Sequence, residues 1–234
     1  MSPRQDGMLQ KLTQILQIAL LLFCCSGATP AQNDQPALYG ILLDNSGSLR
    51  TQFRRVVELG IGTVQHTHKH GPITIFNFRS LATSNDPITV VHTIWNQDAD
   101  VLSRYANSLA VQAGATRLFD AIHFMAIYIN AKTVQEKNPA VRKILVLITD
   151  GEDRKSKIKE EQLIAELKQH QIKVYAIGLV RELDEDSGLI RKSTRERSIN
   201  FLKKVTKETG GRALFPKSNS GDVQALLREL FTEQ

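Results

Sequence analysis

Hydrophobic and polar residues follow two periods along the chain, and from residue 37 onward the two periods take turns. Short apolar runs predict strands at 37–43, 73–78, 88–95, 141–149, 172–180 and 212–215. Apolar residues three or four apart predict helices at 49–67, 98–110, 116–133, 157–170, 198–209 and 223–231. This alternation predicts an α/β fold, a doubly wound and mostly parallel central sheet with helices on both faces and one antiparallel edge strand.

Two carboxylates follow directly after predicted strands. Asp44 comes after the first strand, and Asp150 comes after a run that is apolar from Ile144 to Ile148, as in a strand covered on both faces. Ligands of doubly wound sheets bind outside the carboxyl ends of the strands. The fold therefore predicts that Asp44 and Asp150 lie at one edge of the sheet.

Hydroxyl groups accompany these carboxylates. Asp44, Ser46 and Ser48 alternate in the turn after the first strand, so that three hard oxygen atoms can point to one side. Thr116 stands where a long helix begins, after a loop that Gly114 permits. Two carboxylates balance one divalent cation, and hydroxyls add ligands without adding charge. A cation held in this way still attracts an external anion.

The pattern D-x-S-x-S at 44–48, followed by Thr116 and then T-D-G at 149–151, resembles the von Willebrand factor A domain and its metal-ion-dependent adhesion site. The resemblance covers about residues 37–231. It implies a Rossmann-like fold, a divalent cation (Mg²⁺, with Mn²⁺ or Ca²⁺ as alternatives) and a protein partner that contributes an Asp or Glu carboxylate. The metal ligands that it implies are Asp44, Ser46, Ser48, Thr116 and Asp150.

Within that family, residues 116–122 and 148–153 are similar to single-domain exported bacterial proteins, in particular the von Willebrand factor A-related type of acidobacteria. That subgroup implies no particular partner or process. The stretch between Arg181 and Arg197 is dense in charges of both signs, and we expect a solvated loop or insertion there, with room for a turn of helix.

Simpler roles are open for the same residues. Asp44 and Ser46 are common helix caps, Thr116 suits the start of its own helix, and Asp150 before a glycine suits an ordinary turn. We expect positions beside the site, without direct ligation, for three further acids, namely Asp120, Glu152 and Asp153.

Other classes of site fit less well. An EF-hand would need Gly at Leu49 and an acid at Arg55. A hydrolase nucleophile at Ser46 would need Gly where Asp44 stands, and an aspartyl-phosphate enzyme would need Asp where Ser46 stands. We therefore expect no enzyme, with a metal-independent interaction module as the main alternative. We do not expect zinc at three histidines near the end of a helix, His66, His68 and His70, because alternate residues do not converge on a helix.

Charge and the N-terminus bear on partners and location. The 234 residues carry a net charge of +6, scattered among acids without a basic stripe, so we expect no nucleic-acid partner. Residues 1–31 resemble a signal peptide, with Lys11 before an apolar segment at 12–25 and small residues up to Ala31. We expect cleavage near Ala31, a linker at 32–36 and a domain at 37–234 without a membrane span.

The expected location is therefore outside the cytoplasm, either secreted or in the periplasm or cell envelope. An uncleaved anchor and a lipid attached to Cys24 or Cys25 are the alternatives. Both cysteines lie in the predicted signal, so the mature domain would form no disulfide.

Overall fold

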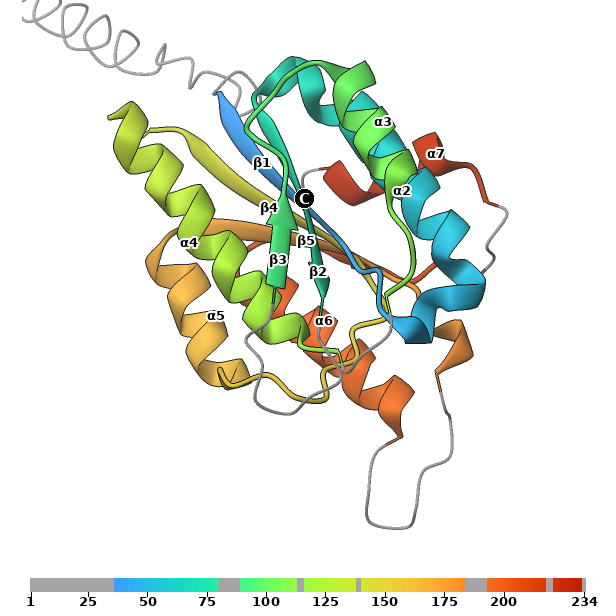
Figure 1. Cartoon of the computed structure of the whole chain (residues 1–234). Coiled ribbons are helices and arrows are strands. Elements are labelled where there is room, and N and C mark those ends of the chain that lie inside the picture. The colour runs from blue at the N-terminus through green and yellow to red at the C-terminus, as the bar shows by residue number, and fades with distance from the viewer. Residues whose placement is uncertain are drawn as a thin grey trace, which may run out of the picture. The chain divides into compact units, whose positions relative to one another are not determined.

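The computed structural model describes residues 36–79, 89–112, 116–137, 140–183, 193–217 and 221–232. Within these residues, six strands form one sheet in the order β3-β2-β1-β4-β5-β6 (Figure 1). The strands are β1 (Ala37–Leu43), β2 (Ile73–Arg79), β3 (Thr89–His92), β4 (Arg142–Thr149), β5 (Ile172–Gly178) and β6 (Ala213–Leu214). The predicted signal peptide, residues 32–35 of the linker and Gly114 lie outside the described residues.

The sheet has the predicted mixed topology. β1 pairs in parallel with β2 and β4, and β5 pairs in parallel with β4 and β6. β3 pairs antiparallel to β2 and lies at the edge. The prediction of a mostly parallel α/β sheet with one antiparallel edge strand is therefore confirmed.

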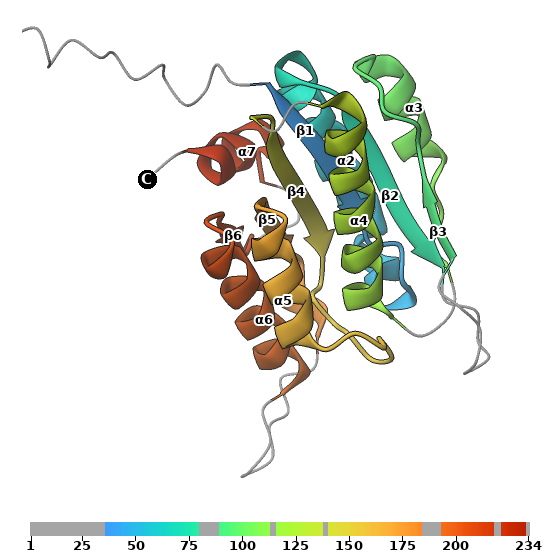
Figure 2. The same ribbon diagram turned by 90° about the vertical axis from the view of Figure 1, so that its left-hand side faces the viewer.

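Helices cover both faces of the sheet. They are α2 (Phe53–Thr67), α3 (Ala99–Ser108), α4 (Leu118–Glu136), α5 (Glu160–Gln169), α6 (Thr194–Glu208) and α7 (Val223–Phe231). Figure 2 shows α4, α5 and α6 in front of the sheet. Short 3-10 helices add η2 (Gly47–Gln52), η3 (His68–His70) and η4 (Val180–Glu182).

The hydrophobic core consists of two clusters, one on each face of the sheet, because successive residues of a strand point to opposite faces. In β1, Ile41 and Leu43 belong to the cluster that includes residues of α2, α3 and α7, whereas Leu42 belongs to the cluster with α4, α5 and α6. Gly40 allows α4 to approach closely, since a Cβ atom there would lie 2.8 Å from Ile129 Cδ1.

Several predicted helix boundaries are wrong by two to four residues, and two of them have a clear cause in the structure. α6 begins at Thr194, not at residue 198, because the Ser193 side chain caps it by accepting a hydrogen bond from the Glu196 amide. Part of the charged stretch from Arg181 to Arg197 is therefore helical. α5 begins at Glu160, not at residue 157, because the amides of Lys157 and Ile158 donate to Asp120.

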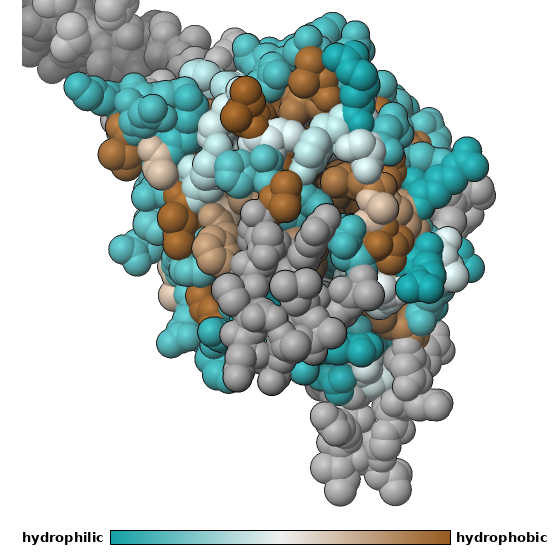
Figure 3. Space-filling model, viewed as in Figure 1, coloured by the Kyte–Doolittle hydropathy of each residue, from teal (hydrophilic) through white to brown (hydrophobic). Residues whose placement is uncertain are grey.

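The surface seen in Figure 3 has hydrophobic residues in separate patches among hydrophilic ones. On α4, Phe124, Ile127 and Val134 are exposed. Among the described residues, the structure has no helix that combines the length and the apolar character required to cross a membrane.

Candidate metal centre

Asp44 joins the carboxyl ends of β1 and β4. Its amide donates to the Ile148 carbonyl, which continues the pairing of the two strands by one residue. The side chain is fully buried, and both oxygens accept hydrogen bonds: Oδ1 from the Ser46 amide at 3.0 Å, and Oδ2 from the Thr149 hydroxyl at 2.6 Å. The carboxylate is therefore fixed in orientation.

Ser46 and Ser48 bring their hydroxyl oxygens within 3.0 Å of each other. Ser46 has extended backbone angles directly before η2, but its side chain makes no capping hydrogen bond. Ser46 therefore does not cap this helix with its side chain, whereas Asp44 accepts from the Ser46 amide directly before the helix. The two hydroxyls face each other beside the buried carboxylates.

Asp150 is buried in the turn after β4. Its Oδ1 accepts from the Glu152 amide at 2.9 Å, as in an ordinary Asx turn. Gly151 has a φ of +76°, and its amide donates to the Thr149 hydroxyl. Asp150 Oδ2 is also buried but has no hydrogen-bond partner, so a turn explains only half of this carboxylate.

The two aspartates disfavour each other's charge. Burial, followed by the negative charge of Asp44, raises the pKa of Asp150 to about 7, although the nearby Ser48 hydroxyl and the Glu152 amide lower it. Burial also raises the pKa of Asp44, against the hydrogen bonds from Thr149 and Ser46. A positive charge between these groups would offset both effects.

Thr116 lies beside this turn. Its carbonyl accepts hydrogen bonds from the amides of Arg154 at 3.0 Å and Lys155 at 3.2 Å, and the residue is buried. The N-cap residue of α4 is Arg117, so Thr116 does not cap the helix. The structure thus gathers Asp44, Ser46, Ser48 and Asp150 and holds the Thr116 backbone against the loop that follows Asp150.

Asp120 and Asp153 have structural partners. Asp120 forms an ion pair with Arg117 at 3.0 Å and accepts from the two amides before α5. Asp153 accepts from the Phe119 amide at 3.1 Å and from Ser156. Both carboxylates therefore fasten the start of α4 to the segment between β4 and α5.

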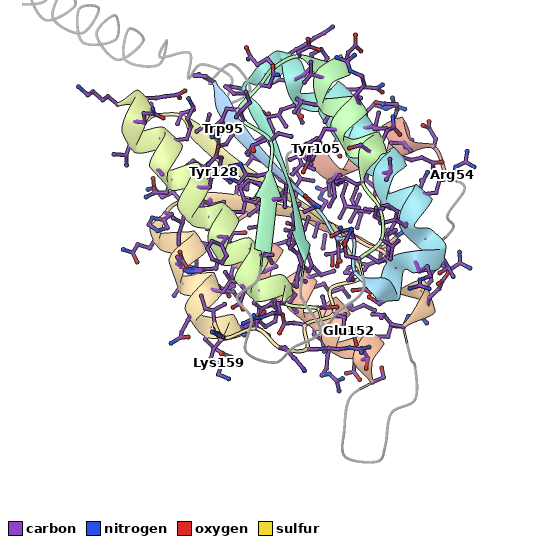
Figure 4. All side chains as sticks on the ribbon, viewed as in Figure 1. Arg54, Trp95, Tyr105, Tyr128, Glu152 and Lys159 are labelled. Atoms are coloured by element: carbon purple, nitrogen blue, oxygen red, sulfur yellow. The ribbon has the colours of Figure 1, made fainter. Side chains whose placement is uncertain are left out.

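Glu152 has an incomplete set of partners. Figure 4 labels it close to the carboxyl ends of the central strands. Its Oε1 lies 2.9 Å from Arg154 Nε, whereas Oε2 is buried without a hydrogen-bond partner. Its charge raises the pKa of both Asp44 and Asp150, which indicates that the three carboxylates are neighbours.

The histidines near the end of α2 have other contacts. His66 stacks on Phe231 with ring centroids 5.1 Å apart, and His68 Nδ1 lies 3.2 Å from the Val64 carbonyl oxygen. In the part of the chain that the structure describes, no three His, Cys, Asp or Glu side chains are grouped as a metal site. The candidate centre at the sheet edge therefore depends on its hydroxyls as well as its two aspartates.

The roles of Thr149 and Asn45 were not predicted from the sequence. Thr149 bridges the site by donating to Asp44 and accepting from Gly151. Asn45 Nδ2 donates to the Ala110 carbonyl, and the backbone carbonyl of Asn45 accepts from the Gln112 amide. These two bonds fasten the segment before Thr116. For Thr149, a hydroxyl residue at the end of a buried strand and directly before Asp150 was a usable signal.

The fit of a divalent cation can be judged from these donors. Carboxylate and hydroxyl oxygens are the ligands that Mg²⁺ prefers, and a cation between them would meet the partnerless Asp150 Oδ2 and offset the raised pKa values of both aspartates. The residues present therefore fit a small divalent ion.

Comparisons with known proteins agree with this architecture. Among solved structures, the chain is similar to the pilus adhesin SpaC from Lactobacillus rhamnosus GG in its open conformation, with a TM-score of 0.60 and 14% identity over 85% of this chain and 30% of that chain. It is also similar to proximal thread matrix protein 1 from the mussel byssus, with a TM-score of 0.60 and 16% identity over 84% of this chain and 47% of that chain.

This chain thus spans less than half of either structure, and such low identity shows a shared fold alone. No curated protein sequence matches the chain. The family model of the von Willebrand factor type A domain matches residues 40–227, which include all five candidate ligands. The chain therefore belongs to the von Willebrand factor type A domain family.

Proposed function

We propose that the protein is an exported interaction domain that binds a divalent cation, with Mg²⁺ preferred over Mn²⁺ or Ca²⁺, and captures an acidic side chain of a protein partner. The ligands in this proposal are Asp44, Ser46, Ser48, Thr116 and Asp150. The observation that carries the proposal is the buried Asp150 Oδ2 without a partner, beside a second buried aspartate. Such an oxygen costs free energy unless a donor or cation meets it.

The charges of the site favour an acidic partner. The bound cation supplies an electrophilic centre, and the two aspartates neutralise its charge. The hydroxyls of Ser46 and Ser48 contribute oxygens without adding negative charge, so an external carboxylate is not repelled. Thr149 and the Ser46 amide hold Asp44 in one orientation, which keeps the donor set ready before the cation arrives.

Export is proposed from the predicted signal at residues 1–31. The similar structures are a pilus adhesin and a matrix protein of byssal threads, which supports an adhesive role outside the cell. We assign no catalytic residue, because Ser46 lies among acidic neighbours and no histidine contacts it among the hydrogen bonds of the described residues.

Calorimetric titration with MgCl₂ tests the cation site. We expect saturable binding by the wild-type chain and none by Asp44→Ala. Asp100→Ala is the matched control, since it removes an exposed carboxylate on α3 and should leave the titration unchanged. Unaltered Mg²⁺ binding by Asp44→Ala would contradict the assignment, and titrations with MnCl₂ and CaCl₂ rank the three ions.

A pull-down from the native envelope or culture medium tests partner capture. We expect a protein that is retained with Mg²⁺, released by a chelator and absent with Asp44→Ala as bait. Retention that survives the chelator would replace the proposal with the metal-independent interaction module. A hydrolytic activity that requires metal and is lost in Ser46→Ala would replace it with an enzyme.

A further inference from the structure

One helix on the surface of the sheet, α4, is hydrophobic on both of its sides. Its inner side is buried in the core, for example at Ile122 and Ile129. Residues 121–131 contain no Asp, Glu, Lys or Arg, so the outer side is uncharged over the same turns. Its neighbour α5 instead exposes charged side chains such as Glu161 and Lys168. A helix that is apolar all round is normally covered on both sides, yet Figure 2 shows no described helix or strand in front of α4.

The outer side of α4 has the residue spacing of a helix–helix contact. Four exposed apolar residues follow one another at intervals of three and four, namely Phe124, Ile127, Ala131 and Val134, which we call the α4 stripe. Their exposed fractions are 45% for Phe124, 46% for Ile127 and 70% for Val134. This is the repeat with which two helices pack along each other. The α4 stripe therefore predicts a helix as its partner.

The α4 stripe is complementary to a second copy of itself in the antiparallel direction. With the pairing centred on Ile129, Phe124 of one copy lies opposite Val134 of the other. In the same way, Ile127 lies opposite Ala131. Each large side chain then faces a smaller one, and the two helix dipoles oppose each other. Parallel pairing would place Phe124 opposite Phe124 and align the dipoles, so the antiparallel direction is favoured.

The charges at the ends of the α4 stripe favour the same direction. In the antiparallel pair, the exposed Lys137 of one copy approaches His123 of the other. His123 Nδ1 lies 2.6 Å from Glu166 Oε2 of α5, so the lysine cation comes close to a carboxylate. Parallel pairing would bring the two Lys137 cations together, and like charges repel.

We propose that the α4 stripe is the interface of a homodimer with two-fold symmetry, in which α4 packs antiparallel on α4 of a second copy of this chain. From Phe124 to Val134 the stripe is about 15 Å long. A contact of this length covers less than the roughly 800 Å² per partner of a standard interface. The dimer is therefore weak, with a Kd between about 1 μM and 1 mM.

The dimer would have a consequence for the candidate metal centre. α4 begins at Leu118, two residues after Thr116, so its N-terminal end lies at the centre. Antiparallel pairing places the centres of the two copies at opposite ends of the helix pair. The dimer would then hold two partner proteins on opposite sides. This consequence rests on the proposed function, whereas the interface itself does not.

Sedimentation velocity measures the interface, with the chain in a chelator at concentrations up to about 1 mM. We expect the wild type to shift reversibly from monomer to dimer as the concentration rises. Ile127→Glu should raise the Kd at least about tenfold, because the dimer would bury an unpaired charge. Val134→Glu should do the same at a position that is 70% exposed in the single chain, where a charge is compatible with folding.

Ala165→Glu is the matched control for both variants. It adds the same charge to an exposed position of the neighbouring helix α5, outside the α4 stripe, and should leave the Kd unchanged. A wild type that stays monomeric up to about 1 mM would overturn the interface. A dimer that is as strong in Ile127→Glu and Val134→Glu as in the wild type would overturn it as well.

Disulfide formation tests the direction of pairing. The two cysteines of the chain, Cys24 and Cys25, are first replaced by serine. Phe124→Cys is then mixed with Val134→Cys and oxidised, and we expect a disulfide between position 124 of one copy and position 134 of the other, identified by mass spectrometry. Each variant alone should stay unlinked, because antiparallel pairing keeps the two copies of one position about 15 Å apart. A variant that links to itself, or a mixture that stays unlinked, would overturn the antiparallel pairing.

The homodimer and the proposed function fail separately, because the dimer is measured in a chelator. Mg²⁺ binding by a chain that stays monomeric would leave the metal centre standing and remove the α4 interface. A dimer that binds no Mg²⁺ would leave the interface standing and remove its role in holding two partners.

Discussion

The two ends of the sheet differ in whether their buried polar groups have hydrogen-bond partners. Near Trp95 and Tyr128, which Figure 4 places together away from Glu152, rings stack and polar groups are paired. The Trp95 and Tyr128 rings are 5.6 Å apart and parallel within 2°. In β2, the Thr74 hydroxyl donates to the Thr93 carbonyl, and the Ile75 amide donates to the Thr93 hydroxyl.

The carboxyl end of the sheet is different. Among the described residues, the buried side-chain oxygens without a hydrogen-bond partner belong to Asn45, Gln52, Asp150 and Glu152. Each of these residues lies in the segments that follow β1 or β4. Each such group lowers the free energy of unfolding. The end of the sheet that holds the candidate site is therefore less stable than it would be with these oxygens paired.

The largest predicted effect concerns a buried acid at this end whose partners are complete. Asp120→Ala would leave Arg117 without its ion pair and the amides of Lys157 and Ile158 without their acceptor. Because both side chains of the pair are more than 90% buried, we expect a loss of about 3–5 kcal/mol in the free energy of unfolding, measured with urea. The exposed control Asp100→Ala should change it by less than about 0.5 kcal/mol. A small loss in Asp120→Ala would mean that this acid does not hold the start of α4 against the segment between β4 and α5.

At the aromatic end, Tyr128→Ala should cost about 2 kcal/mol. The substitution removes the ring that contacts Phe76 at 5.4 Å, His92 at 4.3 Å and Trp95 at 5.6 Å between centroids. Tyr128→Phe keeps the ring and should stay within about 0.5 kcal/mol of the wild type in the same urea experiment. Equal losses in the two variants would show that the hydroxyl, and not ring packing, stabilises this end.

Asp150→Asn should stabilise the metal-free protein, in contrast with Asp120→Ala. The pKa of Asp150 is raised from 3.8 to about 7, so the folded state holds this proton more tightly than the unfolded state. The contribution of this carboxyl to stability therefore falls as the pH rises from about 4 to about 7, and it is lowest above pH 7. The neutral amide removes that penalty, which is on the order of 2–4 kcal/mol at pH 8 for a shift of about three pKa units in a group that is not fully buried.

Urea unfolding at pH 5 and pH 8 in a chelator measures this effect. The gain in Asp150→Asn should be larger at pH 8 than at pH 5, and the same variant should lose Mg²⁺ binding. A variant that is less stable than the wild type at pH 8 would contradict the assignment of Asp150 as a carboxylate whose charge destabilises the metal-free protein.

The sequence allowed part of this site to be predicted. Asp44 and Asp150 could be placed together because each ends an apolar run, and parallel strands bring such ends to one edge. The capping of α6 by Ser193 and the use of Lys157 and Ile158 amides by Asp120 were not foreseen, because they depend on which segments meet in space. The helix boundaries were wrong at these places for that reason.

Glu152 illustrates the same limit. Its position two residues after Asp150 was visible, and a location beside the site was expected, but the burial of Oε2 and a cavity that Glu152 lines together with Phe119 and Phe201 depend on α4 and α6 packing against the turn. Hydrophobic periodicity determines which face of a helix is buried, but it does not determine what a loop carboxylate contacts.

The smallest predicted effect concerns a paired polar group between α3 and the carboxyl-terminal half of β2. Tyr105 of α3 donates its hydroxyl to Asn77 Oδ1 of β2 at 2.9 Å, and Asn77 is buried. Tyr105→Phe should cost about 1 kcal/mol, because the Asn77 oxygen would then resemble the partnerless oxygens at the carboxyl end. A double-mutant cycle with Asn77→Ala in urea unfolding isolates the bond, and we expect a coupling of about 1 kcal/mol. Additive losses would mean that this hydroxyl does not stabilise the fold through Asn77.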